Sequence, residues 1–257
     1  MFIDVHCHID DKTYGDVGAL IEKCRDRGVG RIICVGFDLP SSVYSKELAE
    51  KYDQVYFTAG FHPTELKDYK EGDLHKIKEL CMHEKCVALG EIGLDYHYED
   101  TDRQKQRDIF VRQLGLAAEL GLPVEIHSRD CAEDMLNILK DNRQLLKGGA
   151  LMHCYSHSVE IAEELVKLGL YFSFGGASTW KGSKRAKRVI AMLPAERILT
   201  ETDSPYMPPQ SLYGTFPNTP QSIPEIAANI AAIKGIDEEQ FEMQAYENAL
   251  RLFSKLR

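Results

Sequence analysis

Two histidines one residue apart, His6 and His8, are the first residues in the chain whose spacing suggests chemistry. They follow an apolar run that begins at Phe2 and is typical of a buried strand. Because side chains alternate along a strand, His6 and His8 point to one side and Cys7 to the other. Two imidazoles so placed can bind one divalent ion, but a stable ion usually needs three or four donors. A polar strand end that binds nothing would have the same pattern, so the site depends on further donors.

Residues of metal-ligand type recur at the ends of later apolar runs. They are His62, Glu91, His127, His153, Glu201 and Asp203. In a parallel barrel the carboxyl ends of all strands meet at one mouth, where barrel enzymes keep their chemistry. Any one of these residues could be a solvated loop residue or a hydrogen-bonded core residue. Their recurrence at separate strand ends predicts one shared site.

Short apolar runs alternate with longer amphipathic segments along the whole chain. The predicted strands are 2–8, 31–35, 55–60, 86–91, 123–127, 150–153, 170–174 and 197–202. The predicted helices are 16–27, 41–52, 73–83, 102–120, 131–139, 158–168, 181–193, 223–233 and 238–256. Eight such units indicate an α/β protein, a single-domain (β/α)8 TIM barrel over residues 1–257, closed or slightly distorted, with an extra C-terminal helix. An open doubly wound sheet is the alternative.

The composition of this chain of 257 residues limits the location, redox state and partners that we expect. No apolar run approaches the roughly 20 residues of a membrane span, and we see no signal peptide, so we expect a cytoplasmic location and no membrane partner. The seven cysteines form no C-x-x-C pair, which indicates reduced thiols. The net charge of −9 argues against coating duplex DNA, although metal ions could still attract a phosphate substrate. We expect a monomer.

The residues at these strand ends, with their neighbours, resemble the TatD family of metal-dependent deoxyribonucleases within the amidohydrolase-like barrels. The matching motifs are His6-Cys7-His8, Gly60-Phe61-His62-Pro63, Gly90-Glu91-Ile92-Gly93-Leu94-Asp95-Tyr96, Ile126-His127-Ser128-Arg129-Asp130, Met152-His153-Cys154, Glu201-Thr202-Asp203-Ser204-Pro205-Tyr206 and Asn218-Thr219-Pro220. Two segments depart from the family's pattern, Tyr155-Ser156-His157 and the six residues from Leu212 to Pro217. Both are expected near the mouth, so they bear on substrate choice rather than on metal binding.

The resemblance implies two divalent metal ions and a metal-activated water. The implied ligands are His6, His8, Glu91, His127, His153 and Asp203. Glu91 would bridge the ions, because two cations roughly 3.5–4 Å apart repel each other unless an anion lies between them. The catalytic residues would be Glu91 and Asp203, with Asp203 orienting the water and accepting its proton. The mixture of imidazole and carboxylate suits zinc or manganese better than magnesium, which the resemblance also allows.

Other polar residues near the mouth have two readings, substrate binding or orientation of the metal ligands. They are His62, Arg129, Glu201 and Tyr155. We expect Asp95 and Tyr96 to belong to a loop after Gly93.

A cluster of cations follows Trp180, the only tryptophan. Its members are Lys181, Lys184, Arg185 and Arg188. At i, i+3, i+4 and i+7 they would form one stripe on a helix, with Ala186, Val189, Ile190 and Leu193 on the inner side. The stripe could follow a nucleic-acid backbone while Trp180 stacks on a base, or it could be a solvated face.

Three functions are compatible with these residues. The family resemblance implies exonucleolytic hydrolysis of phosphodiester bonds of DNA, with a preference for single strands or 3' ends. The alternative is a bimetal amidohydrolase-like enzyme that hydrolyses a small ester, lactone or amide. The third is an interaction protein with a structural metal centre, but structural zinc sites are typically closed and rich in thiolates.

Overall fold

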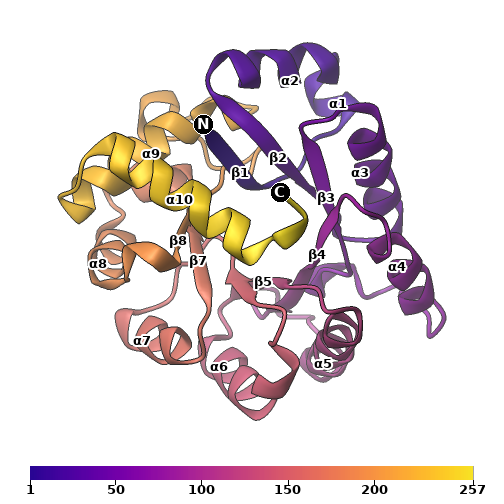
Figure 1. Ribbon diagram of the computed structural model, residues 1–257. Coiled ribbons are helices and arrows are strands. Elements are labelled where there is room, and N and C mark those ends of the chain that lie inside the picture. Colours follow the sequence, from indigo (N-terminus) through magenta and orange to yellow (C-terminus); the bar gives the residue numbers. More distant parts are fainter. Residues whose placement is uncertain (257) are drawn as a thin grey trace.

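Eight parallel strands form a nearly closed barrel in the computed structural model (Figure 1). The structure describes residues 1–256, so the last residue of the predicted domain lies outside the described residues. The strands are β1 (Phe2–Cys7), β2 (Val29–Val35), β3 (Val55–Ala59), β4 (Cys86–Asp95), β5 (Val124–Arg129), β6 (Ala150–Met152), β7 (Tyr171–Phe174) and β8 (Ile198–Thr200). Their order in the sheet is their order in the chain. The predicted barrel is confirmed, and the open doubly wound sheet is wrong.

The barrel closes between β8 and β1 through backbone bonds just beyond the end of β8. The Asp203 amide donates to the His6 carbonyl at 3.0 Å, and the His8 amide donates to the Ser204 carbonyl at 2.7 Å. Parallel ladders join the other neighbouring strands, from β1–β2 to β7–β8, with register shifts in β1–β2, β3–β4 and β4–β5. The slight distortion that the sequence suggested is therefore found at these shifts as well as at the seam between β8 and β1. The seam places Asp203 directly beside His6 and His8.

Helices surround the strands (Figure 1). They are α1 (Asp11–Tyr14), α2 (Val17–Asp26), α3 (Leu39–Lys51), α4 (Asp73–Cys81), α5 (Arg103–Leu120), α6 (Ala132–Asp141), α7 (Val159–Lys167), α8 (Lys184–Met192), α9 (Ile223–Lys234) and α10 (Glu238–Leu252). Several begin where a side-chain oxygen accepts a bond from a backbone amide of the first turn, as at Asp16, Asp38 and Ser158. The buried faces of α2, α4 and α7 explain why their periodicity was readable in the sequence.

Helix α8 begins three residues later than predicted. The Ser183 hydroxyl donates to the carbonyls of Ser178 and Trp180, which holds residues 180–183 in a turn. Lys181 therefore precedes the helix, and the four-cation helical stripe is wrong in that member. Val189 and Ile190 face inward as expected.

Strand β4 is longer than predicted and continues through Gly93 to Asp95. Gly93 has φ +145°, and a Cβ built there would lie 2.0 Å from the His127 carbonyl oxygen. The glycine thus lets β4 approach β5 closely instead of ending the strand. The prediction that Asp95 belongs to a loop is wrong, because it is a buried strand residue.

The barrel interior is closed at its amino end by the C-terminus. Helix α10 crosses this end in Figure 1, where the N and C labels lie near each other. Phe253 and Leu256 belong to one buried cluster with barrel residues such as Val5, Ile33 and Leu199. The predicted extra C-terminal helix is confirmed, although its last turn is a 3-10 helix over Ser254–Leu256.

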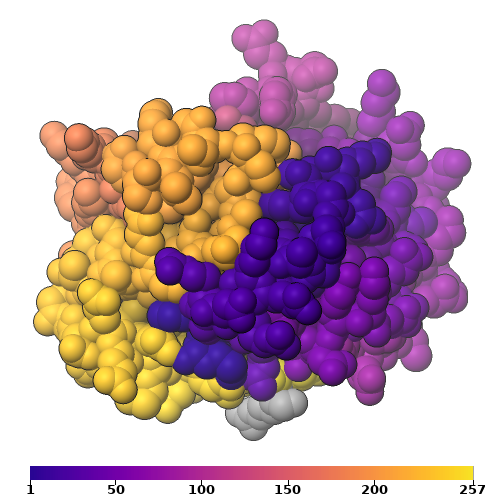
Figure 2. Space-filling view, turned by 90° about the horizontal axis from the view of Figure 1, so that it is seen from above, coloured from indigo at the N-terminus to yellow at the C-terminus, as the bar shows by residue number. Residues whose placement is uncertain are grey.

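The N-terminal and C-terminal parts of the chain also lie side by side at the surface. Figure 2 shows the indigo N-terminal residues in contact with the orange and yellow C-terminal part. Within residues 1–256, no helix has the length and apolar character needed to cross a bilayer.

Candidate metal centre

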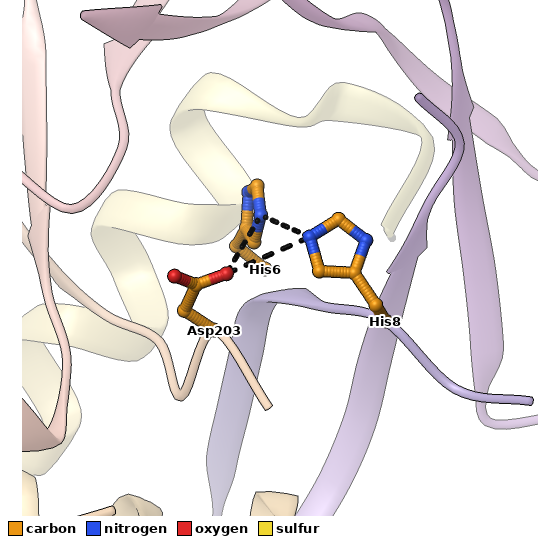
Figure 3. A group of neighbouring side chains, drawn as sticks. All are labelled: His6, His8 and Asp203. Atoms are coloured by element: carbon orange, nitrogen blue, oxygen red, sulfur yellow. Dashed lines mark hydrogen bonds and ion pairs between the residues drawn. The ribbon is translucent and has the colours of Figure 1, made fainter. Parts of the chain in front are cut away.

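Three side chains from the barrel seam form the first half of the site (Figure 3). The Nε2 atoms of His6 and His8 lie 3.1 Å apart. Each lies 3.5 Å from the Oδ1 atom of Asp203. The strand alternation brings the two imidazoles together, and the seam bonds bring the carboxylate. The predicted neighbourhood of His6, His8 and Asp203 is thus present.

Glu91 connects this half to a second one. Its Oε2 atom lies 3.8 Å from the Nε2 atoms of both His6 and His8. Its Oε1 atom lies 3.0 Å from His127 Nδ1 and 2.7 Å from His153 Nε2. The two carboxylate oxygens therefore face two different groups of imidazoles.

The donor spacing in the first half matches that around a bound divalent cation, whereas the donors of the second half lie closer together. Ligands held about 2.1 Å from a tetrahedral ion are separated by roughly 3.4 Å. In the first half the separations are 3.1–3.8 Å. In the second half they are 2.7–3.3 Å, the largest being that between His127 Nδ1 and His153 Nε2. His62 extends the second half, because its Nε2 lies 3.5 Å from Glu91 Oε1.

The pKa shifts within the cluster run in both directions. Burial alone would raise the pKa of Glu91, but the nearby His153 and His62 and a hydrogen bond from His127 hold it well below its usual range. Glu91 is therefore ionised. Burial lowers the pKa of His6 well below its usual range and that of His62 to about 3. Burial alone would lower the pKa of His153, but Glu91 and Glu201 raise it well above its usual range, so this imidazole would release a proton when an ion binds. The His6 and His153 rings stack at 3.9 Å between centroids.

Sequence reasoning missed two acids that orient the imidazoles. Glu125 Oε1 lies 2.6 Å from His6 Nδ1, and Asp95 Oδ2 lies 3.1 Å from His127 Nε2. Each contacts the ring nitrogen that points away from the site, as carboxylates do behind metal-binding histidines. The signal for Glu125 was a charged residue between the apolar Val124 and Ile126, because an isolated buried carboxylate is costly.

The remaining candidates occupy different places. Arg129 is exposed and lines the cavity above the site with His62. Glu201 lies within reach of His6 and His153 but is fully buried, and it accepts bonds from the Cys154 amide and the Ser173 hydroxyl.

Tyr155 also lines the cavity but packs inward. It is 4% exposed, it contacts Phe172, and its hydroxyl donates to the Ser158 carbonyl. Beside it, His157 Nε2 lies 2.7 Å from the Ser128 hydroxyl, a contact that the sequence did not predict.

The cavity above the cluster has a volume of about 1180 Å³ and opens at the mouth of the barrel. Of the predicted cationic stripe, only Arg185 lines it. Three residues of its wall, Cys154, Asp203 and Met207, have positive φ values, which L residues rarely adopt. Such backbone conformations concentrate at functional sites.

A barrel whose strand ends bring imidazoles and carboxylates together at an open mouth belongs to the class of barrel metallohydrolases. An interaction protein with a purely structural metal centre does not fit this open, carboxylate-rich arrangement.

Comparison with known proteins specifies the family. The sequence model for TatD related DNase matches residues 3–254. The chain is 41% identical over 254 residues to the uncharacterised metal-dependent hydrolase YabD of Bacillus subtilis, covering 98% of this chain and 99% of that one. It is 32% identical to the 3'-5' ssDNA/RNA exonuclease TatD of Klebsiella pneumoniae, covering 93% of this chain and 92% of that one.

A solved structure agrees with this family assignment. The TatD homolog YjjV of Escherichia coli superposes with a TM-score of 0.93 at 31% identity and 98% coverage of both chains. The chain belongs to the TatD related DNase family and is a metal-dependent hydrolase.

Proposed function

We propose that this protein hydrolyses phosphodiester bonds of nucleic acid with two divalent ions, and that it removes nucleotides from single-stranded ends of DNA. The observation that carries the proposal is the geometry of Glu91, whose two oxygens face two separate groups of imidazoles. A relative bears the name of a 3'-5' ssDNA/RNA exonuclease, which supports removal of nucleotides from an end and the strand preference.

The first ion would be held by His6, His8, Asp203 and Glu91. The second would be held by Glu91 with the two remaining ligands, His127 and His153. When bound, such a pair activates water near neutral pH and offsets charge on a phosphoryl oxygen. Zinc or manganese suits this mixed donor set best.

Asp203 would act as the proton acceptor. Its Oδ1 faces His6 and His8, while its other oxygen points away from both rings (Figure 3). The residue also lines the cavity, so a water or substrate can reach it. A carboxylate in this position can orient the attacking water and accept its proton.

The cavity suits an extended anion. Its volume of about 1180 Å³ exceeds the roughly 300–1,000 Å³ typical of small-molecule sites. Arg129 and Arg185 line it and offer positive charge to a phosphate, while Asp10 and Glu65 are further acidic residues of its wall. Guanidinium groups pair well with phosphate. These features favour a polynucleotide over a small neutral ester.

The test compares substrates and one variant. Metal-loaded and chelator-treated protein is incubated with end-labelled single-stranded DNA, duplex DNA and a panel of chromogenic esters. We expect metal-dependent shortening of the single strand from one end. Hydrolysis of esters with intact DNA would instead indicate the amidohydrolase alternative.

Glu91→Gln isolates the bridging carboxylate. Removing an outer partner of a metal ligand costs about 10–100-fold, so losing the bridge should lower kcat/KM by more than about 100-fold. Glu119→Gln, at an exposed ion pair on α5, is the matched control and should leave turnover unchanged. Full turnover in Glu91→Gln would contradict the assigned role.

A further inference from the structure

Exposed aromatic side chains gather on one loop at the mouth of the barrel. Tyr206 is 58% exposed, Tyr213 65% and Phe216 67%, and Leu212 beside them is 45% exposed. Among residues 1–256, eight large hydrophobic side chains are at least 45% exposed, and these four lie within eleven consecutive residues. Apolar side chains gathered on a surface in this way mark binding sites.

Two of these rings belong to the wall of the metal-centre cavity. Tyr206 and Phe216 line it together with Glu91 and Asp203. Their centroids are 6.5 Å apart and their planes are inclined by 46°. Tyr206 follows Asp203 by three residues, and its amide donates to the Asp203 carbonyl at 3.0 Å. The aromatic wall is therefore fixed directly to a predicted metal ligand.

Buried polar bonds hold the base of this loop. Asn218, which is 1% exposed, donates its side-chain amide to the carbonyls of Tyr206 at 2.9 Å and Thr202 at 3.2 Å. Its own backbone amide donates to the Pro205 carbonyl at 2.9 Å. A loop fixed in this way presents its rings with little ordering left to do on binding.

Trp180 is a second anchor for the loop. Its indole N–H donates to the Pro208 carbonyl at 2.8 Å, and its ring meets Tyr213 edge to face at 5.5 Å. Trp180 is partly buried and also lines the cavity, so the hypothesis that it stacks on a base stays a prediction. Tyr206 and Phe216 have exposed rings on the cavity wall.

The chemical groups around the cavity indicate which kind of substrate the rings would contact. Tyr206 and Phe216 follow β8, whereas Arg129 ends β5, which lies three strands away from β8 in the barrel. An occupant of this cavity therefore meets metal ligands at the floor, aromatic rings on one side and a cation on another. A nucleotide has both the phosphate and the flat ring that match these surfaces.

We propose that Tyr206 and Phe216 form a base-stacking subsite for unpaired nucleobases next to the phosphate at the metal centre. This inference rests on the proposed phosphodiesterase function. Bases in a duplex are stacked on one another, so the subsite would select single-stranded ends. The rings position the substrate and are not catalytic.

The test removes bases from the substrate and rings from the protein. We compare a single-stranded oligonucleotide with the same strand lacking bases on three nucleotides at each end. Wild-type protein should prefer the first substrate about tenfold or more. In the Tyr206→Ala/Phe216→Ala variant kcat/KM for the first should fall about tenfold or more, and kcat/KM for the second should change less than about twofold.

Two variants serve as controls. Leu212→Ala removes an exposed apolar residue of the same loop that does not line the cavity, and it should leave both substrates unchanged. Tyr206→Phe keeps the ring and should retain the preference. Metal content measured in each variant shows whether the neighbouring Asp203 still binds.

Several outcomes would overturn the subsite. The same loss on both substrates would mean that the rings only shape the loop, and no loss on either would mean that they do not contact the substrate. If wild-type protein hydrolyses neither strand, the proposed function fails instead. Fluorescence anisotropy of a labelled strand then decides the subsite, because unchanged affinity in the double variant contradicts it and a tenfold weaker affinity supports it.

Discussion

Carboxylates behind the imidazoles control how individual site residues point. Asp95 accepts from His127 Nε2 at 3.1 Å, which leaves Nδ1 free to face Glu91. Burial alone would raise the pKa of Asp95, but the hydrogen bond from His127 lowers it, so this acceptor is ionised. Glu125 occupies the same position behind His6. The site therefore extends beyond the atoms that would contact metal.

Asp95→Ala should weaken metal binding at the second half of the site by about 10–100-fold, because His127 loses the acceptor that fixes its orientation. Asp95→Asn retains an oxygen acceptor and should lose less. Competition with a chromogenic chelator measures both affinities. Asp26→Ala, at the surface end of α2, is the control. Equal affinities in the wild type and all three variants would contradict a role for Asp95 in metal binding.

The metal-ligand neighbourhood was predictable from residue types, but the partners of the supporting acids were not. His6 and His8 follow from strand alternation, and Glu91, His127 and His153 from their places at strand ends. Asp95 and Glu125 act through contacts with histidines that lie 32 and 119 positions away along the chain. Strand periodicity carries no information about such pairs.

Among the elements, the close contact between β4 and β5 depends on Gly93. Any Cβ at this position would lie 2.0 Å from the His127 carbonyl oxygen, and the backbone has φ +145°. Gly93→Ala should reduce the free energy of unfolding by about 2–6 kcal/mol, combining backbone strain with overpacking. Chemical denaturation measures this change.

Gly115→Ala on α5 is the matched control. A Cβ there has no atom within 4 Å, and alanine is the better helix former. We expect an increase in stability of about 0.5–1 kcal/mol. A loss of similar size in both variants would show that the contact at Gly93 is not special.

Element boundaries were the weaker part of the sequence prediction. Eight strands and their helices follow from the alternation of apolar and amphipathic runs. The end of β4 was missed because glycine commonly interrupts strands, whereas here it serves a close approach. The start of α8 was missed because the bonds of the Ser183 hydroxyl to two carbonyls hold a turn that periodicity does not reveal.

For the whole molecule, the C-terminus completes the barrel interior. Phe253 is fully buried beside residues from β1 and β2. Phe253→Ala should cost about 3–5 kcal/mol of unfolding free energy. Met243→Ala on the exposed side of α10 should change stability by less than about 0.5 kcal/mol. A small effect at Phe253 would mean that the barrel is stable without this closure.

Metal binding should stabilise the entire barrel, because its ligands come from β1, β4 and β5 and from the segments after β6 and β8. An ion at 100 times its Kd adds about 2.7 kcal/mol, which corresponds to a rise in Tm of roughly 5–10 °C for a chain of this size. Differential scanning calorimetry with and without a chelator measures the rise.

The position of Glu91 between the two halves leads to a more specific prediction for the rise in Tm. Because Glu91 contributes to both halves, Glu91→Gln should remove most of the rise in Tm, whereas loss of a ligand from one half alone should remove only part of it. His153→Ala is the comparison, since His153 belongs to the second half. One unfolding transition, shifted as a unit by metal, is the behaviour expected of a single domain. If Glu91→Gln kept the full rise, the ions would bind elsewhere, and if metal shifted only one of two transitions, the barrel would not unfold as one cooperative unit.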